Sequence, residues 1–153
     1  MSAAITAQLQ TGHIGLNVTD LEQSKQFYQD VFGFTVIQES GDEAHRFAFL
    51  GDGSRLVLTL WQQSQGRFEK GQPGLHHLSF QVDSIDQVKQ FEKRLGELGV
   101  SLFHQGIVSH REGAASGGLF FADPDGIRLE IYSPTGADEY SAPTAGAPTC
   151  GFF

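Results

Sequence analysis

Residues 12–36 and 76–100 repeat one sequence pattern at a constant offset of 64 positions. The first copy is "GHIGLNVTDLEQSKQFYQDVFGFTV" and the second is "HHLSFQVDSIDQVKQFEKRLGELGV". Aligned identities include His13 with His77, Val18 with Val82, Gln23 with Gln87, and the run 25–27 with 89–91. A chain with two copies of one unit is expected to fold as two similar modules that bury their apolar faces together.

Each copy begins with the pattern of a half-buried strand. Apolar residues alternate with polar ones over residues 13–18 and 77–82, which predicts one apolar and one polar face per strand. The polar face includes the matched His13 and His77. Adjacent side chains of a strand leave by opposite faces, so His76 and His77 cannot serve the same site. We expect His77 to share a function with His13 and His76 to be structural.

A helix is expected after each strand. Asp20 followed by Gln23, and Ser84 followed by Gln87, are patterns typical of a helix N-cap. The residues behind them recur at helical spacing and are predicted to face the core: Leu21, Phe27, Val31, Ile85, Val88, Phe91, Leu95 and Leu98.

Further strands complete each module. Segments 46–61 and 119–132 each contain a strand, an Asp-Gly turn and a second strand. When the two turns are aligned, Val57 stands opposite Glu130. The second copy therefore carries a carboxylate at a strand position where the first copy is apolar.

These patterns predict an α+β fold built from paired βαβββ modules. The first module is expected at residues 11–61 and the second at 75–134, joined by a polar, glycine-rich linker at 62–74. Residues 135–153 lack strand or helix periodicity and are expected to form an irregular tail over the surface or on a partner chain.

Composition limits the partners and the location of the chain. The formal net charge is −8 and the basic residues are scattered, which argues against nucleic acid or an anionic membrane as partner. The first fifteen residues do not have a signal-peptide pattern and no segment reaches membrane-spanning length, so a cytoplasmic protein is expected. The single cysteine, Cys150, excludes an internal disulfide framework and a cysteine-rich metal site.

The polar strand faces suggest a metal site. His13, His77 and Glu130 would provide two imidazoles and one carboxylate, a facial set that holds a divalent transition metal and leaves positions open for substrate and water. A metal bound in this way acts as a Lewis acid. Taken alone, a strand histidine is more often a satisfied or surface residue and a strand glutamate usually faces water. The pairing of the two histidines by the repeat favours the metal hypothesis. Fe(II), Zn, Mn, Ni and Co all suit such ligands.

Three segments resemble the vicinal oxygen chelate superfamily: "GHIGLNVTDLEQSKQFYQDVFGF", "HHLSFQV" and "FFADPDGIRLEIY". This superfamily includes glyoxalase I, fosfomycin-resistance transferases, extradiol ring-cleaving dioxygenases and bleomycin-resistance proteins. The resemblance covers residues 11–134. It implies a cup-shaped, half-open barrel of paired βαβββ modules (the glyoxalase-like fold) around a metal, often within a homodimer, with His13, His77 and Glu130 as ligands.

Departures from the individual families narrow the expected activity. Glyoxalase I has a further carboxylate ligand where this chain has Val57. The bleomycin-resistance proteins lack the metal ligands that this chain keeps. Fosfomycin transferases carry a Lys, Ser and Tyr set, and the corresponding stretch here offers His110, Ala114, Gly118 and Phe120.

The ligand set resembles that of extradiol dioxygenases most closely, which implies Fe(II) and a ring-cleaving reaction on a small substrate that binds through two neighbouring oxygens. Many such enzymes have two domains of this type, and this chain has length for one. His110 and Tyr132 are candidates for the catalytic acid or base, and Arg128 for holding an anionic substrate group or as a surface residue. The alternatives are a metal-dependent lyase or isomerase, and a protein that sequesters an antibiotic without turnover.

Overall fold

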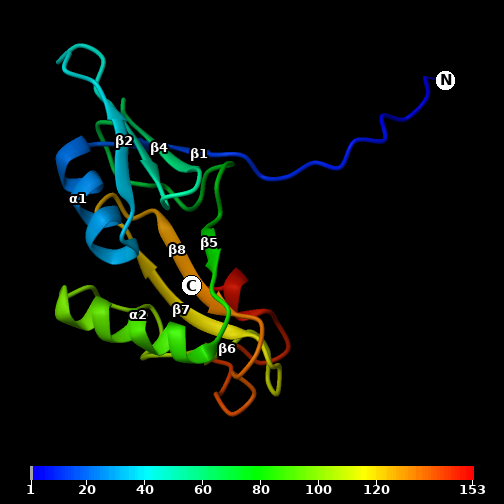
Figure 1. Ribbon diagram of the computed structural model, residues 1–153. Coiled ribbons are helices and arrows are strands. Elements are labelled where there is room, and N and C mark those ends of the chain that lie inside the picture. The colour runs from blue at the N-terminus through cyan, green and yellow to red at the C-terminus, as the bar shows by residue number, and fades with distance from the viewer. Residues whose placement is uncertain (1) are drawn as a thin grey trace.

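The computed structural model describes residues 2–153 and contains two βαβββ units followed by a tail (Figure 1). The first unit comprises β1 (Ile14–Val18), α1 (Leu21–Phe32), β2 (Thr35–Glu39), β3 (Phe47–Gly51) and β4 (Leu56–Gln62). The second comprises β5 (Leu78–Gln81), α2 (Ile85–Glu97), β6 (Val108–Ser109), β7 (Gly117–Ala122) and β8 (Arg128–Ser133). This arrangement confirms the predicted α+β fold of paired modules.

Each unit forms its own four-stranded sheet. The strand orders are β1-β4-β3-β2 and β5-β8-β7-β6. In both sheets the first and last strands of the unit run parallel and lie side by side, and the other neighbours are antiparallel. The parallel pairing of β5 with β8 places Ser79 beside Glu130. Residues that are far apart in sequence thus meet on one sheet face.

Both helices begin at the predicted N-caps. The Asp20 carboxylate accepts a hydrogen bond from the Gln23 amide at 3.0 Å, and the Ser84 hydroxyl accepts one from the Gln87 amide at 3.3 Å. The Gln87 side chain in turn accepts from the Asp83 amide at 2.8 Å. These bonds satisfy amide groups that a helix leaves unpaired in its first turn.

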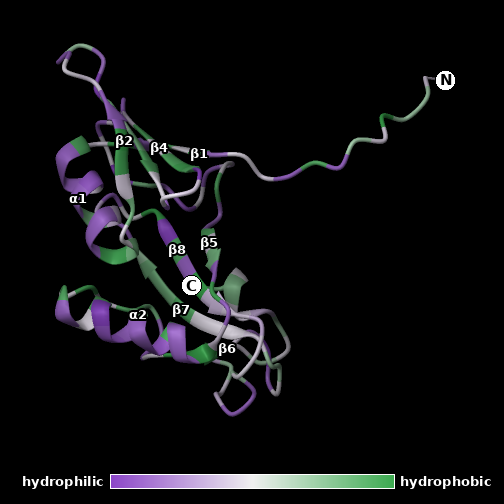
Figure 2. Cartoon of the chain, viewed as in Figure 1, coloured by the Kyte–Doolittle hydropathy of each residue, from purple (hydrophilic) through white to green (hydrophobic). Residues whose placement is uncertain are grey.

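The apolar face of each sheet packs under its helix, and Figure 2 shows green, hydrophobic stretches on β4 and β7 beside helices that are largely purple. Helix α1 also contacts the second unit. The rings of Phe27 and Phe32 lie 6.4 and 6.2 Å from the ring of Phe121 on β7, and Phe32 lies 4.7 Å from Phe80 on β5. The two units therefore share one aromatic core. Within residues 2–153, the helices are too short or too polar to cross a membrane.

A buried hydrogen bond also joins the units. The Tyr28 hydroxyl of α1 donates to Asp123 Oδ2 at 2.8 Å, and Asp123 Oδ1 accepts from the amides of Asp125 and Ile127, each at 2.9 Å. Burial raises the pKa of Asp123 to about 6, with a further contribution from the charge of Asp125, although its hydrogen bonds act in the opposite direction. Ionised Asp123 is thus disfavoured in the folded chain.

Asp123→Asn is expected to change how stability depends on pH. The pKa of Asp123 is about 6 in the folded chain and 3.8 in its ordinary state. Between pH 3.8 and 6 the folded chain therefore binds more protons than the unfolded chain does. This group therefore stabilises the fold most below pH 4, and its contribution falls by about 3 kcal/mol as the pH rises to 6. Asparagine keeps the acceptor oxygen and does not titrate, so this loss should disappear from urea unfolding curves measured from pH 4 to 7.

The matched control for this substitution is Asp138→Asn, at an exposed aspartate of the tail. Its unfolding free energy should follow the wild-type pH dependence. An Asp123→Asn curve parallel to the wild-type curve between pH 4 and 6 would show that Asp123 ionises normally in the fold.

The chain after β8 folds back over the second unit and includes a short 3-10 helix, Thr149–Gly151. Thr149 is fully buried. Its amide donates to the His110 carbonyl at 2.9 Å, and its hydroxyl donates to the Ser109 carbonyl at 2.7 Å. In Figure 1 this red segment lies beside β8 and β5, away from α2. The tail therefore covers the sheet face that α2 leaves free.

Candidate functional site

A buried carboxylate is the centre of the candidate site. Glu130 on β8 is 3% exposed. Its Oε1 atom accepts a hydrogen bond from the Ser79 hydroxyl at 2.6 Å and lies 3.9 Å from His77 Nε2. The strand register explains this grouping, because β5 and β8 pair in parallel and direct alternate side chains to the same face. The predicted ligands His77 and Glu130 are thus neighbours.

His110 contacts the other oxygen of this carboxylate. Its Nε2 atom lies 2.8 Å from Glu130 Oε2, and its Nδ1 atom lies 2.9 Å from the Ser116 hydroxyl. The ring is half-buried, and both of its nitrogens have partners. This position suits a group that orients Glu130 or exchanges a proton with a molecule bound beside it.

The adjacent histidines lie just before β5 and their rings contact each other, so they do not leave by opposite faces as the strand phase predicts. His77 is half-buried and faces Glu130, whereas His76 is exposed. Their Nδ1 atoms are 2.8 Å apart, so one ring donates a hydrogen bond to the other. Burial lowers the pKa of His77, although the charge of Glu130 acts in the opposite direction. Neutral imidazole is the form that binds metal ions, and a partner on Nδ1 leaves Nε2 free to coordinate.

His13 lies apart from this group. It is exposed, immediately before β1, and within residues 2–153 its side chain makes no hydrogen bond or ion pair. Among these same residues, no three His, Cys, Asp and Glu side chains are arranged to hold a metal ion. One chain therefore brings together two of the three predicted ligands, and the three-ligand site stays a prediction.

The His77–Glu130 pair has dimensions that suit one edge of a metal site. Metal bonds of about 2.0–2.2 Å place adjacent ligand atoms roughly 3.0–3.5 Å apart in octahedral or tetrahedral geometry. The separation of 3.9 Å between His77 Nε2 and Glu130 Oε1 is a few tenths of an ångström wider, so the two side chains would move slightly closer to share an ion. Imidazole with carboxylate is a donor pair that first-row transition metals accept. The pair fits a divalent metal and needs a further ligand from outside this group.

The remaining predicted residues lie at the margins of the site. Arg128 is 6% exposed, and its Nε atom donates to the His76 carbonyl at 3.0 Å. Tyr132 donates its hydroxyl to Gln81 at 2.8 Å, and its ring lies 5.2 Å from that of His110. Because the Tyr132 hydroxyl is bonded to Gln81, Tyr132 contacts the site through its ring, which packs against the ring of His110.

Two features of the site were not predicted. Ser79 bonds directly to Glu130, and its place two residues after His77 on the polar strand face could have identified it. Phe153 packs against His77 with ring centres 5.6 Å apart. No local pattern indicates that contact, because it depends on how the tail folds back.

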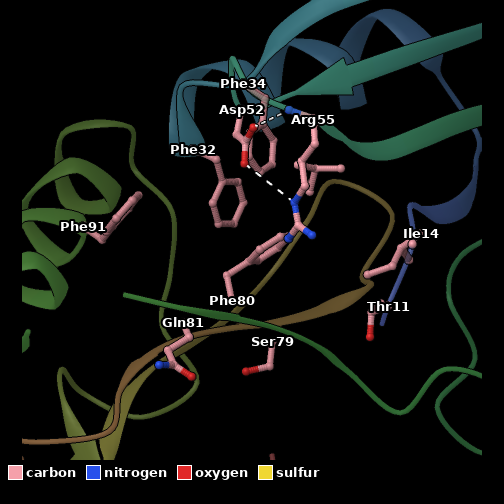
Figure 3. A pocket seen from close by; sticks show the side chains of 12 residues that line it. Thr11, Ile14, Phe32, Phe34, Asp52, Arg55, Ser79, Phe80, Gln81 and Phe91 are labelled. Carbon is pink, nitrogen blue, oxygen red and sulfur yellow. Dashed lines mark hydrogen bonds and ion pairs between the residues drawn. The ribbon is translucent and has the colours of Figure 1, made fainter. Parts of the chain in front are cut away.

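A cavity of about 480 Å³ adjoins the site through β5 (Figure 3). The rings of Phe32 and Phe34 gather with Phe80 along its apolar side, at 4.7 and 5.8 Å from Phe80. Polar groups face them: Arg55 lies beside Asp52, and Ser79 and Gln81 of β5 line the cavity together with Val57 of β4. Glu130, His77 and His110 do not line this cavity, so Ser79 is its link to the candidate site.

Comparison with known proteins gives a consistent result. Residues 10–131 match the family model described as the Glyoxalase/Bleomycin resistance protein/Dioxygenase superfamily. Among solved structures, the chain is similar to a glyoxylase/bleomycin resistance protein/dioxygenase domain from Frankia sp. EAN1pec, with a TM-score of 0.70 and 25% identity. That match covers 83% of this chain and 93% of that one.

Two curated relatives have names that suggest different reactions. A trivalent organoarsenical cleaving enzyme of Bacillus sp. (strain MD1) is 32% identical over 139 residues, which cover 90% of this chain and 80% of the relative. A catechol-2,3-dioxygenase of Bacillus subtilis (strain 168) is 31% identical over 125 residues, which cover 80% of this chain. The match spans only 40% of the length of that dioxygenase.

Proposed function

The chain belongs to the Glyoxalase/Bleomycin resistance protein/Dioxygenase superfamily, and on that premise we propose that it is a divalent-metal-dependent enzyme acting on a small substrate that binds through two neighbouring oxygens. The observation that carries this proposal is the buried Glu130 carboxylate between His77 and His110. The Glu130–His77 pair would hold the metal, and His110 would exchange a proton with the substrate oxygen beside it.

A second copy of the chain would complete the site with His13. Along β3 and β4, alternate residues are buried under α1, so Phe47, Phe49 and Trp61 point to the opposite sheet face. Their rings lie 5.1–5.8 Å apart and are half-buried. A side chain added at Gly15 would meet the Trp61 ring, so Gly15, and with it His13, shares this face.

This aromatic face supports a homodimer. Half-buried aromatic clusters on an uncovered sheet face are typical of interfaces. If the second unit of a partner covers it, His77 of the partner subunit and Glu130 of the partner subunit would come to lie against His13. Each dimer would then contain two equivalent sites related by a two-fold axis.

Ring-cleaving dioxygenation with Fe(II) is the first candidate reaction. A two-histidine, one-carboxylate set leaves positions open for substrate and O₂, and bound Fe(II) supplies the activation of O₂. By strand register the first-unit position equivalent to Glu130 is Thr59, which is not a carboxylate, and this also favours an open site. The catechol-2,3-dioxygenase relative agrees with this chemistry.

A second candidate is cleavage of a carbon–arsenic bond, favoured by the organoarsenical-cleaving relative, which this chain matches over most of both lengths. Trivalent arsenic is a soft centre that prefers thiolates, in line with the general preference of soft ions for sulfur ligands. The chain contains one cysteine, Cys150, so one chain cannot offer a pair of thiolates.

Metal analysis of protein purified without chelator tests the proposed function. We expect about one divalent metal per chain, because each proposed site uses one Glu130 and one His77. Stoichiometric Fe(II), with O₂ uptake on addition of a catechol, would support ring cleavage. Zn, Ni or Mn without O₂ uptake would favour a lyase or isomerase. Absence of metal after loading with each of these ions would contradict the enzyme proposal and leave a sequestering protein.

A further inference from the structure

The cavity of about 480 Å³ lies between the two units. The first unit contributes the end of α1, the start of β1 and the turn between β3 and β4, and the second contributes β5 and one residue of α2. Its volume is within the range of roughly 300–1,000 Å³ that is typical of small-molecule sites. Because Glu130, His77 and His110 do not line it, the proposed metal site does not account for this space.

Aromatic rings form one side of this cavity. The rings of Phe32 and Phe34 are 5.3 Å apart, and Phe32 lies 4.7 Å from Phe80 and 6.2 Å from Phe91. The side chains of Phe32, Phe80 and Phe91 are only half-buried, so part of each ring is free to contact a ligand. An apolar group that enters the cavity would remove this aromatic surface from water. This side of the cavity therefore suits an apolar or aromatic group.

One acid and one base also line the cavity. Within the described chain, Asp52 and Arg55 are the only charged residues that do so. Asp52 Oδ1 accepts hydrogen bonds from the Ser54 amide, the Ser54 hydroxyl and the Arg55 amide, at 2.9, 2.9 and 3.0 Å. These bonds lower the pKa of Asp52, so its carboxylate is ionised at neutral pH. They also fix the carboxylate in the turn between β3 and β4 through one oxygen, Oδ1.

The side chains of Asp52 and Arg55 are only loosely paired. Arg55 Nε lies 4.0 Å from Asp52 Oδ2, and among residues 2–153 the Arg55 guanidinium donates no hydrogen bond. Figure 3 shows the Arg55 side chain extending from the turn toward the ring of Phe80. A guanidinium has five N–H donors, and a carboxylate oxygen accepts more than one hydrogen bond. Both groups can therefore bind a ligand that carries the two opposite charges.

We infer that this cavity binds a free α-amino acid with an aromatic or large apolar side chain. The carboxylate of the ligand would accept hydrogen bonds from Arg55, its ammonium group would donate to Asp52 Oδ2, and its side chain would lie against Phe32 and Phe80. The two charged groups of an α-amino acid are joined through one carbon, which suits partners only 4.0 Å apart. A simple anion or cation would pair with one of these residues and meet the like charge of the other. The charges of the cavity therefore favour a zwitterion.

Titration calorimetry with L-phenylalanine on the full chain tests this inference. We expect saturable binding of one molecule per chain, with or without bound metal, because the site uses none of the candidate metal ligands. 3-Phenylpropanoate lacks the ammonium group and 2-phenylethylamine lacks the carboxylate, so each should bind at least about tenfold more weakly. Glycine keeps both charges but has no ring, and it should also bind at least about tenfold more weakly.

Two variants test which residue binds each charge of the ligand. Arg55→Gln should weaken binding of L-phenylalanine by about tenfold but should not weaken binding of 2-phenylethylamine, since the amine does not use the guanidinium. Asp52→Asn should weaken L-phenylalanine to a similar extent but should not weaken 3-phenylpropanoate. Asparagine keeps the oxygen that accepts from the turn amides, so the turn should stay intact.

The matched control is Arg111→Gln, at an exposed arginine that does not line the cavity. Its affinity for L-phenylalanine should stay within about twofold of the wild type, because a surface substitution away from the site changes little.

Three results would overturn the inference. Absence of saturable L-phenylalanine binding would show that the cavity is a packing gap between the units. Equal affinity for L-phenylalanine and either single-charge analogue would show that the cavity accepts an apolar group without recognising both charges. Unchanged affinity in both Arg55→Gln and Asp52→Asn would place the bound amino acid elsewhere on the chain. None of these results depends on metal binding, so the proposed function is tested separately.

Discussion

His77→Ala is expected to abolish stoichiometric metal binding, whereas His76→Ala should retain most of it. His77 is half-buried, and its Nε2 atom points toward Glu130, 3.9 Å from Oε1. Removing one ligand of a three-ligand site leaves two, and we expect the affinity to fall by more than about 100-fold, beyond the 10–100-fold typical of losing an outer partner. His76 bonds to Nδ1 of His77, the ring nitrogen that would not coordinate the metal. Removing the His76 side chain should therefore lower the metal affinity by about tenfold or less. Competition with a coloured chelator measures both affinities.

Two controls accompany these variants. His45 is an exposed histidine at the turn between β2 and β3, paired with Asp42, and His45→Ala should bind metal as the wild type does. Circular dichroism should show that all three variants keep the fold. If His76→Ala lost the metal and His77→Ala kept it, the strand phase assigned to these two residues would be wrong.

The assignment of His77 shows how far the sequence alone can lead. Strand alternation and helix caps are local effects, so the repeat was enough to predict two βαβββ units and the caps at Asp20 and Ser84. The alignment of Val57 with Glu130 was wrong by two positions, because β1 pairs Gly15 with Thr59 where β5 pairs Ser79 with Glu130. The search for a difference between the two units nevertheless identified Glu130, the buried carboxylate that β8 directs toward His77.

The arrangement of the units could not be predicted in this way. Alternation tells which face a side chain leaves by, but not which sheet faces come together. His13 and His77 have the same phase in their units, yet β1 and β5 lie in separate sheets, and the two histidines do not meet within one chain. The position of Phe153 depends on the anchor at Thr149, which is a long-range contact without periodicity. Such contacts depend on tertiary packing rather than on local pattern.

The separation of His13 from Glu130 leads to the second large expected effect. Mixed dimers of His13→Ala and Glu130→Gln chains should recover metal binding and activity that neither variant has alone. If each site takes His13 from one chain and the His77–Glu130 pair from the other, a mixed dimer has one intact site and one doubly defective site. With random exchange of subunits half of the dimers are mixed, so about a quarter of all sites should be restored.

The matched control is a mixture of His77→Ala and Glu130→Gln chains. Both residues lie in the second unit of the same chain, where β5 and β8 hold them 3.9 Å apart, so no exchange of subunits can rebuild an intact pair. Metal content and turnover should stay at the level of the separate variants. Exchange is verified with a size-tagged chain. If the His13→Ala and Glu130→Gln mixture exchanges subunits but also stays inactive, His13 does not act across the interface, because only a site shared between chains permits this complementation.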